Sequence, residues 1–262
     1  MDLHSVMNSG GVPDLVRAPN LGVPHAFTTR AGGVSSAPYS SLNLGLSSGD
    51  AEAPVAENRR RVLAAFGVDE TRVCAFSQVH GARVLTGRPS WFEEEADAAV
   101  TDTPGLALVV STADCLPVLF HDPCTGAVGA AHCGWRGTLQ GVAVRVLQKL
   151  SALYGTDPAD VQVAFGPSVL APNYQVGAEV VAAFREAGFP EHVSAPDGTG
   201  RSLLDVAAAN RWALLRGGVQ PANLWESGLC TYGDPERFYS HRRDKGKTGR
   251  HWAVIKSSVI KS

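Results

Sequence analysis

The stretch Leu106 to Gly137, LALVVSTADCLPVLFHDPCTGAVGAAHCGWRG, decides the fold of this chain. It contains three short apolar runs rich in β-forming residues, at 106–110, 117–120 and 127–131. Asp122 to Gly126 is typical of a tight turn, so the pattern predicts a strand, a break, a strand, a hairpin turn and a strand. Cys115 falls in the break and His132 follows the third run. We therefore expect these two side chains on neighbouring strands at one edge of a sheet.

Segments before and after this stretch have apolar residues at helical spacing. Apolar residues recur at helical intervals from Thr138 to Tyr154, and Gly155 is a stop signal. We expect three further helices and one further strand, near 55–66, 176–187 and 203–215 for the helices and 161–165 for the strand. Since this order is not strictly βαβ, we predict an α/β (mixed α+β) fold, a mixed sheet flanked by helices. No repeat or long linker divides the chain, so we expect an irregular segment at 1–18 and a single catalytic domain at 19–262.

Composition excludes several classes of protein. The chain has 262 residues and a formal net charge of −2, and its 23 basic residues are scattered, which disfavours a nucleic-acid partner. No apolar stretch approaches membrane-spanning length and no export signal is evident, so we expect a cytoplasmic protein with no membrane partner. The cysteines number five, an odd count without a CxxC pair, which favours reduced thiols. A small-molecule ligand follows as the default; the oligomeric state is left open.

Two imidazoles and one thiolate, from His80, Cys115 and His132, make a ligand set that suits Zn²⁺. Three protein ligands leave a coordination position free, which is typical of a catalytic rather than a structural zinc site. Copper is an alternative, adventitious occupant, because the affinity of divalent metals for such ligands peaks at copper. Multicopper oxidation itself is disfavoured, since the chain has 8 histidines and no His-x-His element.

Other polar residues have two or more interpretations each. Arg136, in the turn before the predicted helix, either binds an anion such as phosphate or makes a structural salt bridge. Arg30, Arg242 and Arg243 either clamp phosphate or ribose or are solvated charges. Asp114 is a general base, an orienter of a ligating histidine, or a strand-end cap.

The chain resembles the YfiH-like family, often labelled laccase-domain or polyphenol oxidase, over almost its whole length. The motifs that carry the resemblance include His25 to Ser35, Ser41 to Gly45, Glu57 to Arg59, Gln78 to Gly81, Ala96 to Val100, Ala113 to Pro117, Gly134 to Gly137, Phe165 to Pro167, Cys230 with Thr231, Tyr239 to Asp244 and Thr248 to Arg250. The chain departs from the family pattern in having Cys133 after the third ligand and Pro172 to Gln175 where the family has Cys-Cys-Tyr-Glu. These departures put any role of that cysteine pair or glutamate in question here.

The resemblance implies a YfiH-like fold and a purine nucleoside phosphorylase acting on adenosine, inosine, guanosine and methylthioadenosine, with adenosine deaminase activity. It implies that nucleoside and phosphate are the partners and that the metal ligands are His80, Cys115 and His132. We expect the catalytic residues to be Cys115, Asp114 and Arg136. We expect the substrate-binding residues to be Arg30, Asn43, Gln78 and Arg243.

Two alternative functions use the same residues. In a metal-free cysteine hydrolase, Cys115 is the nucleophile and His80 or His132 the base. The family resemblance suggests an amide of a peptidoglycan precursor as its substrate. A copper-dependent polyphenol oxidase is the less favoured alternative, for want of imidazole ligands.

Overall fold

The three apolar runs of the stretch 106–137 form strands, but these strands belong to two different sheets. In the computed structural model, which describes residues 12–258, they are β7 (Ala107–Thr112), β8 (Leu116–His121) and β9 (Val128–Cys133). Strands β8 and β9 form the expected antiparallel hairpin, whereas β7 lies in the other sheet. The predicted break is therefore the crossing from one sheet to the other. At its centre Asp114 has a positive φ of 89°.

Each of the two large sheets has six strands and mixes parallel with antiparallel pairs, as predicted. The first has the order β1 (Leu15–Val16), β2 (His25–Thr28), β15 (His251–Lys256), β7, β3 (Val73–Ser77) and β5 (Ser90–Glu95). The second has the order β14 (Leu224–Glu226), β10 (Gln162–Phe165), β8, β9, β6 (Ala98–Thr101) and β4 (Val84–Thr86).

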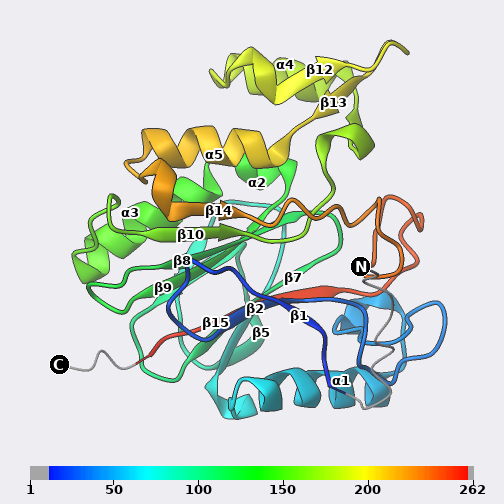
Figure 1. The fold of residues 1–262 in the computed structure, drawn as a ribbon, viewed down its shortest axis with the longest axis vertical. Coiled ribbons are helices and arrows are strands. Elements are labelled where there is room, and N and C mark those ends of the chain that lie inside the picture. Colours follow the sequence, from blue (N-terminus) through cyan, green and yellow to red (C-terminus); the bar gives the residue numbers. More distant parts are fainter. Residues whose placement is uncertain (1–11, 259–262) are drawn as a thin grey trace, which may run out of the picture.

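The two sheets pack face to face between helices (Figure 1). Helix α1 (Glu52–Ala65) covers the outer face of the first sheet, where Val62 and Leu63 join a core with Trp252. Helices α3 (Val142–Tyr154) and α5 (Val206–Arg216) cover the second sheet. Between the sheets, side chains such as Phe27 and Phe76 form a third core. The structure is thus a four-layer α/β/β/α arrangement, because each sheet buries one face on the other sheet and one on helices.

The predicted helix 138–154 occurs as two helices. Helix α2 (Trp135–Leu139) begins earlier than expected, and α3 follows after Gln140 and Gly141. Gly141 has a φ of 75°, a left-handed conformation that a continuous helix does not contain. Gly155 ends α3 as predicted, with its amide donating to Ser151 O.

The remaining elements lie on the α5 side of the molecule or at its edge. A small sheet of β11 (Gln175–Val176), β13 (Ser202–Leu204) and β12 (Ser194–Pro196) packs with α4 (Ala178–Glu186) near α5 (Figure 1). Of the segment 1–18 that we expected to be irregular, residues 1–11 lie outside the described residues, and β1 pairs with β2. Within residues 12–258, no helix is both long and apolar enough to cross a membrane.

Candidate metal centre and substrate cavity

His80, Cys115 and His132 meet in space, as the sequence predicts. One potential ligand atom from each residue lies within 4.8 Å of the other two. The pairing of β8 with β9 accounts for two of the three, because Leu116 lies opposite Cys133 and Pro117 opposite His132. His80 comes from the loop after β3, and its ring centroid lies 4.8 Å from that of His132.

Asp97 organises this cluster from behind. The backbone amides of Val79, His80 and Gly81 donate to its carboxylate at 3.3, 3.0 and 2.6 Å. The same carboxylate accepts from His132 Nδ1 at 2.8 Å, and its side chain is fully buried. Asp97 therefore fixes the His80 loop, whose His80 has a φ of 59°, and leaves His132 Nε2 as the nitrogen that can bind a metal.

The glycines of the motif Gly134 to Gly137 are explained by close approach to the cluster. A Cβ atom on Gly134 would lie 2.8 Å from His80 Nδ1 and 3.2 Å from Cys115 Sγ. A Cβ atom on Gly137 would lie 2.8 Å from Gly81 O. A side chain at Gly134 would therefore displace the His80 ring, and one at Gly137 would displace the backbone of the His80 loop.

The electrostatics of the cluster favour a thiolate. Burial alone would raise the pKa of the Cys115 thiol, but the neighbouring His132 and His80 rings lower it. Burial disfavours a charged His132 ring, yet the Cys115 thiolate and the Asp97 carboxylate raise its pKa. By contrast, burial raises the pKa of the adjacent Cys133, which remains a neutral thiol.

This donor set can hold a metal ion. It offers a thiolate and two imidazole nitrogens in one place, and a carboxylate orients one of the imidazoles, as is common for metal-binding histidines. The same set also contains a thiolate beside an imidazole, which is the pairing of a cysteine nucleophile. The geometry supports the metal more strongly, because both imidazoles converge on the thiolate.

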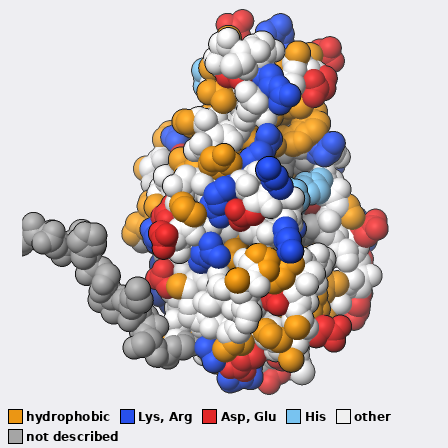
Figure 2. Space-filling model, turned by 90° about the vertical axis from the view of Figure 1, so that its right-hand side faces the viewer, with side chains coloured by type: hydrophobic (Ala, Val, Ile, Leu, Met, Phe, Trp, Pro, Cys, Tyr) orange, Lys and Arg blue, Asp and Glu red, His pale blue; other side chains and the backbone are white. Residues whose placement is uncertain are grey.

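The cluster opens into a cavity of about 740 Å³, a size typical of small-molecule sites. Four arginines line this cavity, namely Arg59, Arg136, Arg242 and Arg250. Among its described lining residues, the one carboxylate is that of Asp114. Figure 2 shows the face at the right of Figure 1, where Lys and Arg side chains gather near the middle with a His beside them. The cavity is therefore suited to an anionic ligand.

Asp114 has its carboxylate fully engaged. It accepts from Thr231 Oγ1 at 2.6 Å, from Ser240 Oγ at 3.0 Å and from the backbone amide of Arg242 at 2.6 Å. These bonds anchor the loop between β14 and β15 beside Cys115 and bring the Arg242 side chain to the cavity. Of the three interpretations of Asp114, an anchoring role has the most support, because no carboxylate oxygen is left without a donor.

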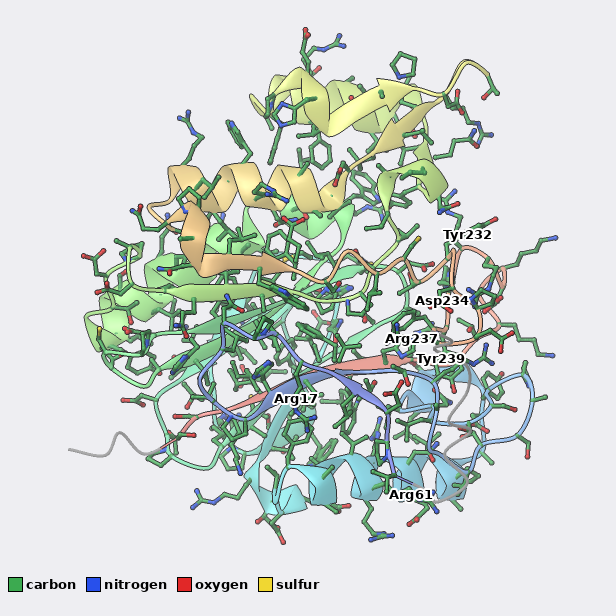
Figure 3. All side chains as sticks on the ribbon, in the orientation of Figure 1. Arg17, Arg61, Tyr232, Asp234, Arg237 and Tyr239 are labelled. Atoms are coloured by element: carbon green, nitrogen blue, oxygen red, sulfur yellow. The ribbon has the colours of Figure 1, made fainter. Side chains whose placement is uncertain are left out.

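The same loop is fixed to the segment that follows β2. In Figure 3 its residues Tyr232, Asp234, Arg237 and Tyr239 are labelled at the right of the view. Tyr239 Oη donates to Tyr39 O at 2.6 Å, and the amide of Arg30 donates to Arg237 O at 2.9 Å. Two polar loops that are far apart in sequence thus close one side of the cavity together.

The expected site residues divide into two groups. Those that line the cavity are Gln78, His80, Asp114, Cys115, His132 and Arg136. Those outside the lining are Arg30, Asn43 and Arg243, which bond to their own chain. Arg30 donates to Ser40 O and Pro235 O. Arg243 donates to Thr231 O, Tyr232 O and Phe238 O, so the guanidinium serves the loop and not the cavity.

Several cavity residues were given no role from the sequence. They are Arg59, Tyr174 and Arg250 in the cavity lining, together with Asp97, which bonds to His132 in the candidate metal cluster. Arg59, Asp97 and Arg250 lie in motifs that carry the family resemblance, but the motifs did not indicate what these side chains do. Tyr174 lies in the departing segment, and the Arg242 guanidinium lies 5.2 Å from its ring centroid. Burial, with Cys115 nearby, raises the pKa of Tyr174 to about 12, so it stays a neutral phenol.

Known proteins resemble this chain throughout. Residues 24–258 match the family described as "Multi-copper polyphenol oxidoreductase laccase". A protein of Deinococcus radiodurans named purine nucleoside phosphorylase is 48% identical over 95% of this chain and 94% of its own length. Purine nucleoside phosphorylase YfiH of Escherichia coli is 38% identical over 89% and 93%. The crystal structure of YlmD from Geobacillus stearothermophilus superposes with a TM-score of 0.88 at 34% identity, covering 94% of this chain and 96% of that one.

Proposed function

Because this chain belongs to the YfiH family of laccase-domain proteins, we propose that it is a zinc-dependent purine nucleoside phosphorylase. The proposed substrates are adenosine, inosine, guanosine and methylthioadenosine, with phosphate as the second substrate. Hydrolytic deamination of adenosine is the proposed second activity: water attacks C6 of the purine ring and ammonia leaves, which gives inosine. The observation that carries the proposal is the convergence of His80, Cys115 and His132 within 4.8 Å in a cavity lined by arginines.

The residues of the cavity suggest how phosphorolysis proceeds. A zinc ion held by the three ligands would supply Lewis-acid chemistry to the reacting groups. Arg136 and Arg242 bind phosphate near Cys115, because both line the same cavity as that thiolate and a guanidinium makes charge-assisted hydrogen bonds to an oxyanion. Phosphate attacks the anomeric carbon of the ribose, and the bond to the purine breaks as positive charge develops on the sugar.

Gln78 is held in a fixed orientation at the cavity wall. Its Nε2 donates to Ser111 O at 2.8 Å, and its Oε1 accepts from the amide of Ser111 at 2.7 Å. Both polar ends are thereby engaged with β7. In the proposed reaction Gln78 shapes the wall against which the nucleoside lies.

An assay with adenosine, in the presence and absence of phosphate, tests the proposal. Adenine that forms only with phosphate demonstrates phosphorolysis. Inosine that forms without phosphate demonstrates deamination. If the zinc-loaded protein produces neither compound, the proposal is refuted.

A cysteine hydrolase acting on an amide, as in peptidoglycan precursors, is the second candidate. The hydrogen-bonded Cys115 and His132 pair favours it, since a thiolate beside an imidazole is a ready nucleophile. Chelation separates the two functions. Activity that survives chelation and is lost with one equivalent of a thiol alkylator supports the hydrolase, whereas activity restored by added zinc supports the phosphorylase. A copper-dependent polyphenol oxidase has less support, because the chain lacks His-x-His elements.

A further inference from the structure

Arg59 is a buried cation in the lining of the cavity, to which Gly45, Leu46 and Ser47 also contribute. The residue is 9% exposed, and its Nε and Nη2 atoms donate to Leu44 O at 2.9 and 2.8 Å. Its guanidinium lies 5.3 to 5.4 Å from the ring centroids of three aromatic residues, namely Trp91, Phe92 and Trp252. Among the residues that the structure describes, no carboxylate forms an ion pair with Arg59.

Arg250 is tied to the same segment of backbone. The amide of Leu44 donates to Arg250 O at 3.1 Å, and Asn43 Oδ1 accepts from the amides of Gly45 and Arg250 at 3.1 and 2.9 Å. Arg250 Nη1 donates to Thr248 O and Gly249 O at 3.1 and 3.0 Å, which fixes the guanidinium. Asn43 thus lies outside the cavity lining but organises the backbone between the two arginines.

The charges in the cavity exceed what one phosphate needs. Arg136 and Arg242 lie with Tyr174 on the Cys115 side, and the Asp114 carboxylate is already bonded to its own chain. Cys115 and Asp114 act electrostatically on Arg250, whereas the charged group that acts on Arg59 is Glu70. The Arg59 guanidinium therefore lies against Trp91, Phe92 and Trp252, whereas the Arg242 guanidinium lies against Tyr174. Arg250 is close enough to Cys115 and Asp114 for their charges to act on it, so it borders both parts of the cavity.

A buried guanidinium with donors facing a cavity is a site for an oxyanion. Aromatic walls reduce the access of water to Arg59, and charge-assisted hydrogen bonds are stronger where water is excluded. An uncharged nucleoside would leave this charge without a counterion. A phosphate ester would neutralise it and would accept hydrogen bonds from both arginines.

We propose that Arg59 and Arg250 form a second anion subsite, which binds the 5′-phosphate of a purine nucleoside monophosphate. This inference rests on the proposed function, because it assumes that the nucleoside part lies beside His80, Cys115 and His132. The cavity then accepts nucleotides as well as nucleosides. Arg136 and Arg242 remain available for free phosphate.

Titration calorimetry with adenosine, adenosine 5′-monophosphate and inorganic phosphate tests this subsite in the zinc-loaded protein. We expect the monophosphate to bind at least about tenfold more tightly than adenosine, a factor that one charge-assisted contact can supply. Arg59→Gln and Arg250→Gln should each remove most of this preference. Arg60→Gln is the matched control on the same helix: its side chain is 64% exposed, and the substitution changes the net charge equally. This variant should keep the preference.

Equal affinity for adenosine and its monophosphate in the unsubstituted protein would overturn the subsite. A preference that survives in Arg250→Gln and in Arg59→Lys, which keeps the charge but not the fork of donors, would also overturn it. Arg59→Gln could fail to fold, because Arg59 also donates to Leu44 O. The comparison of Arg250→Gln with Arg59→Lys does not depend on that variant. If both glutamine variants weaken only the binding of inorganic phosphate, the arginines serve free phosphate and the nucleotide assignment is wrong. Because the zinc-loaded protein is also proposed to deaminate adenosine, the titration is repeated with inosine and inosine 5′-monophosphate, which have no amino group to lose. Without phosphate these ligands bind but do not react, so a failed phosphorolysis assay would leave this result standing, and the reverse also holds.

Discussion

The Asp97 carboxylate accepts a hydrogen bond from His132 Nδ1 at 2.8 Å while it holds the amides of Val79, His80 and Gly81. One buried side chain thus positions two of the three proposed metal ligands. Asp97 directly precedes β6, and His132 follows Ala131 in β9. The pairing of these strands places Ala98 opposite Ala131 and so brings the Asp97 carboxylate next to the His132 ring.

Replacing Asp97 with Asn should weaken metal binding. An amide cannot accept as strongly from the His132 ring, and loss of such a carboxylate typically costs about 10- to 100-fold in metal affinity. Competition with a coloured zinc chelator measures the effect directly. The exposed Asp102→Asn is the control and should bind zinc normally; equal zinc affinity in both variants would show that Asp97 only supports the fold.

Replacing Cys115 with Ala should abolish stoichiometric zinc binding and phosphorolysis together. The thiolate is the anionic ligand of the set, and its removal leaves two neutral imidazoles. Cys133→Ala is the matched control, because Cys133 is adjacent to the cluster but buried and uncharged. Elemental analysis of both purified variants gives the answer. Full metal content with intact phosphorolysis in Cys115→Ala would remove Cys115 from the ligand set.

Arg136→Gln should raise the KM for phosphate by about tenfold or more and change the KM for the nucleoside much less. The reason is the loss of a charge-assisted contact to the anion, and each factor of ten corresponds to about 1.4 kcal/mol. Steady-state kinetics with each substrate varied in turn measure the two constants. Arg145→Gln, at an exposed position of α3, removes the same charge and should leave both constants unchanged. A similar rise in both variants would indicate a general charge effect.

Asp114→Asn should lower the free energy of unfolding by about 1–3 kcal/mol, because charged acceptors make the stronger hydrogen bonds of a buried network. Three donors lose their charged acceptor: Thr231 Oγ1, Ser240 Oγ and the Arg242 amide. Urea denaturation measures the loss, with Asp102→Asn again as control. A destabilised but active variant would support the anchoring role, whereas a fully stable, inactive one would support a role in proton transfer.

The free energy of unfolding should fall as the pH decreases from about 6.5 towards 3. Burial lowers the pKa of His251 from 6.5 to about 3, so the folded protein keeps this ring neutral in that window. The unfolded chain binds a proton there, and each pH unit costs up to about 1.4 kcal/mol for this group. Burial lowers the pKa values of His25 and His121 as well, which adds to the slope.

Urea denaturation at about pH 7 and pH 5 separates this effect from the titration of carboxylates, which lies mostly at lower pH. The exposed His192→Gln should leave the slope unchanged. Equal unfolding free energies at the two pH values would contradict the prediction.

The sequence predicted the elements of the fold better than their partners. Apolar runs identified β7, β8 and β9, but the assignment of β7 to another sheet depends on the turn at Asp114, which periodicity does not reveal. Gly141 interrupts a pattern that is otherwise helical from Trp135 to Tyr154, so the break was missed.

The cluster of His80, Cys115 and His132 was predictable because two imidazoles and a thiolate have a specific chemistry, and Arg136 was predictable from its place before a helix. The other arginines of the cavity were not. Arg242 and Arg243 are neighbours with the same side chain, and Asp114 decides between them by holding the Arg242 amide and Ser240. The helical spacing places Arg59 in the same pattern as Val55 and Val62 on α1, but the pattern does not show what surrounds its charge. Arg59 is buried because Trp91, Phe92 and Trp252 surround it, and these contacts arise only after the first sheet has formed.

The position of β15 has a consequence for how the protein is made. This strand pairs with β2 on one side and β7 on the other, although it follows both by well over a hundred residues in the chain. The strand also brings Arg250, which directly precedes it, to the cavity and its first residue, His251, into the protein interior. A nascent chain in which β2 and β7 have already left the ribosome therefore exposes one unpaired edge of each strand until β15 emerges. During this interval both edges can pair with strands of other chains, so the incomplete first sheet is open to aggregation.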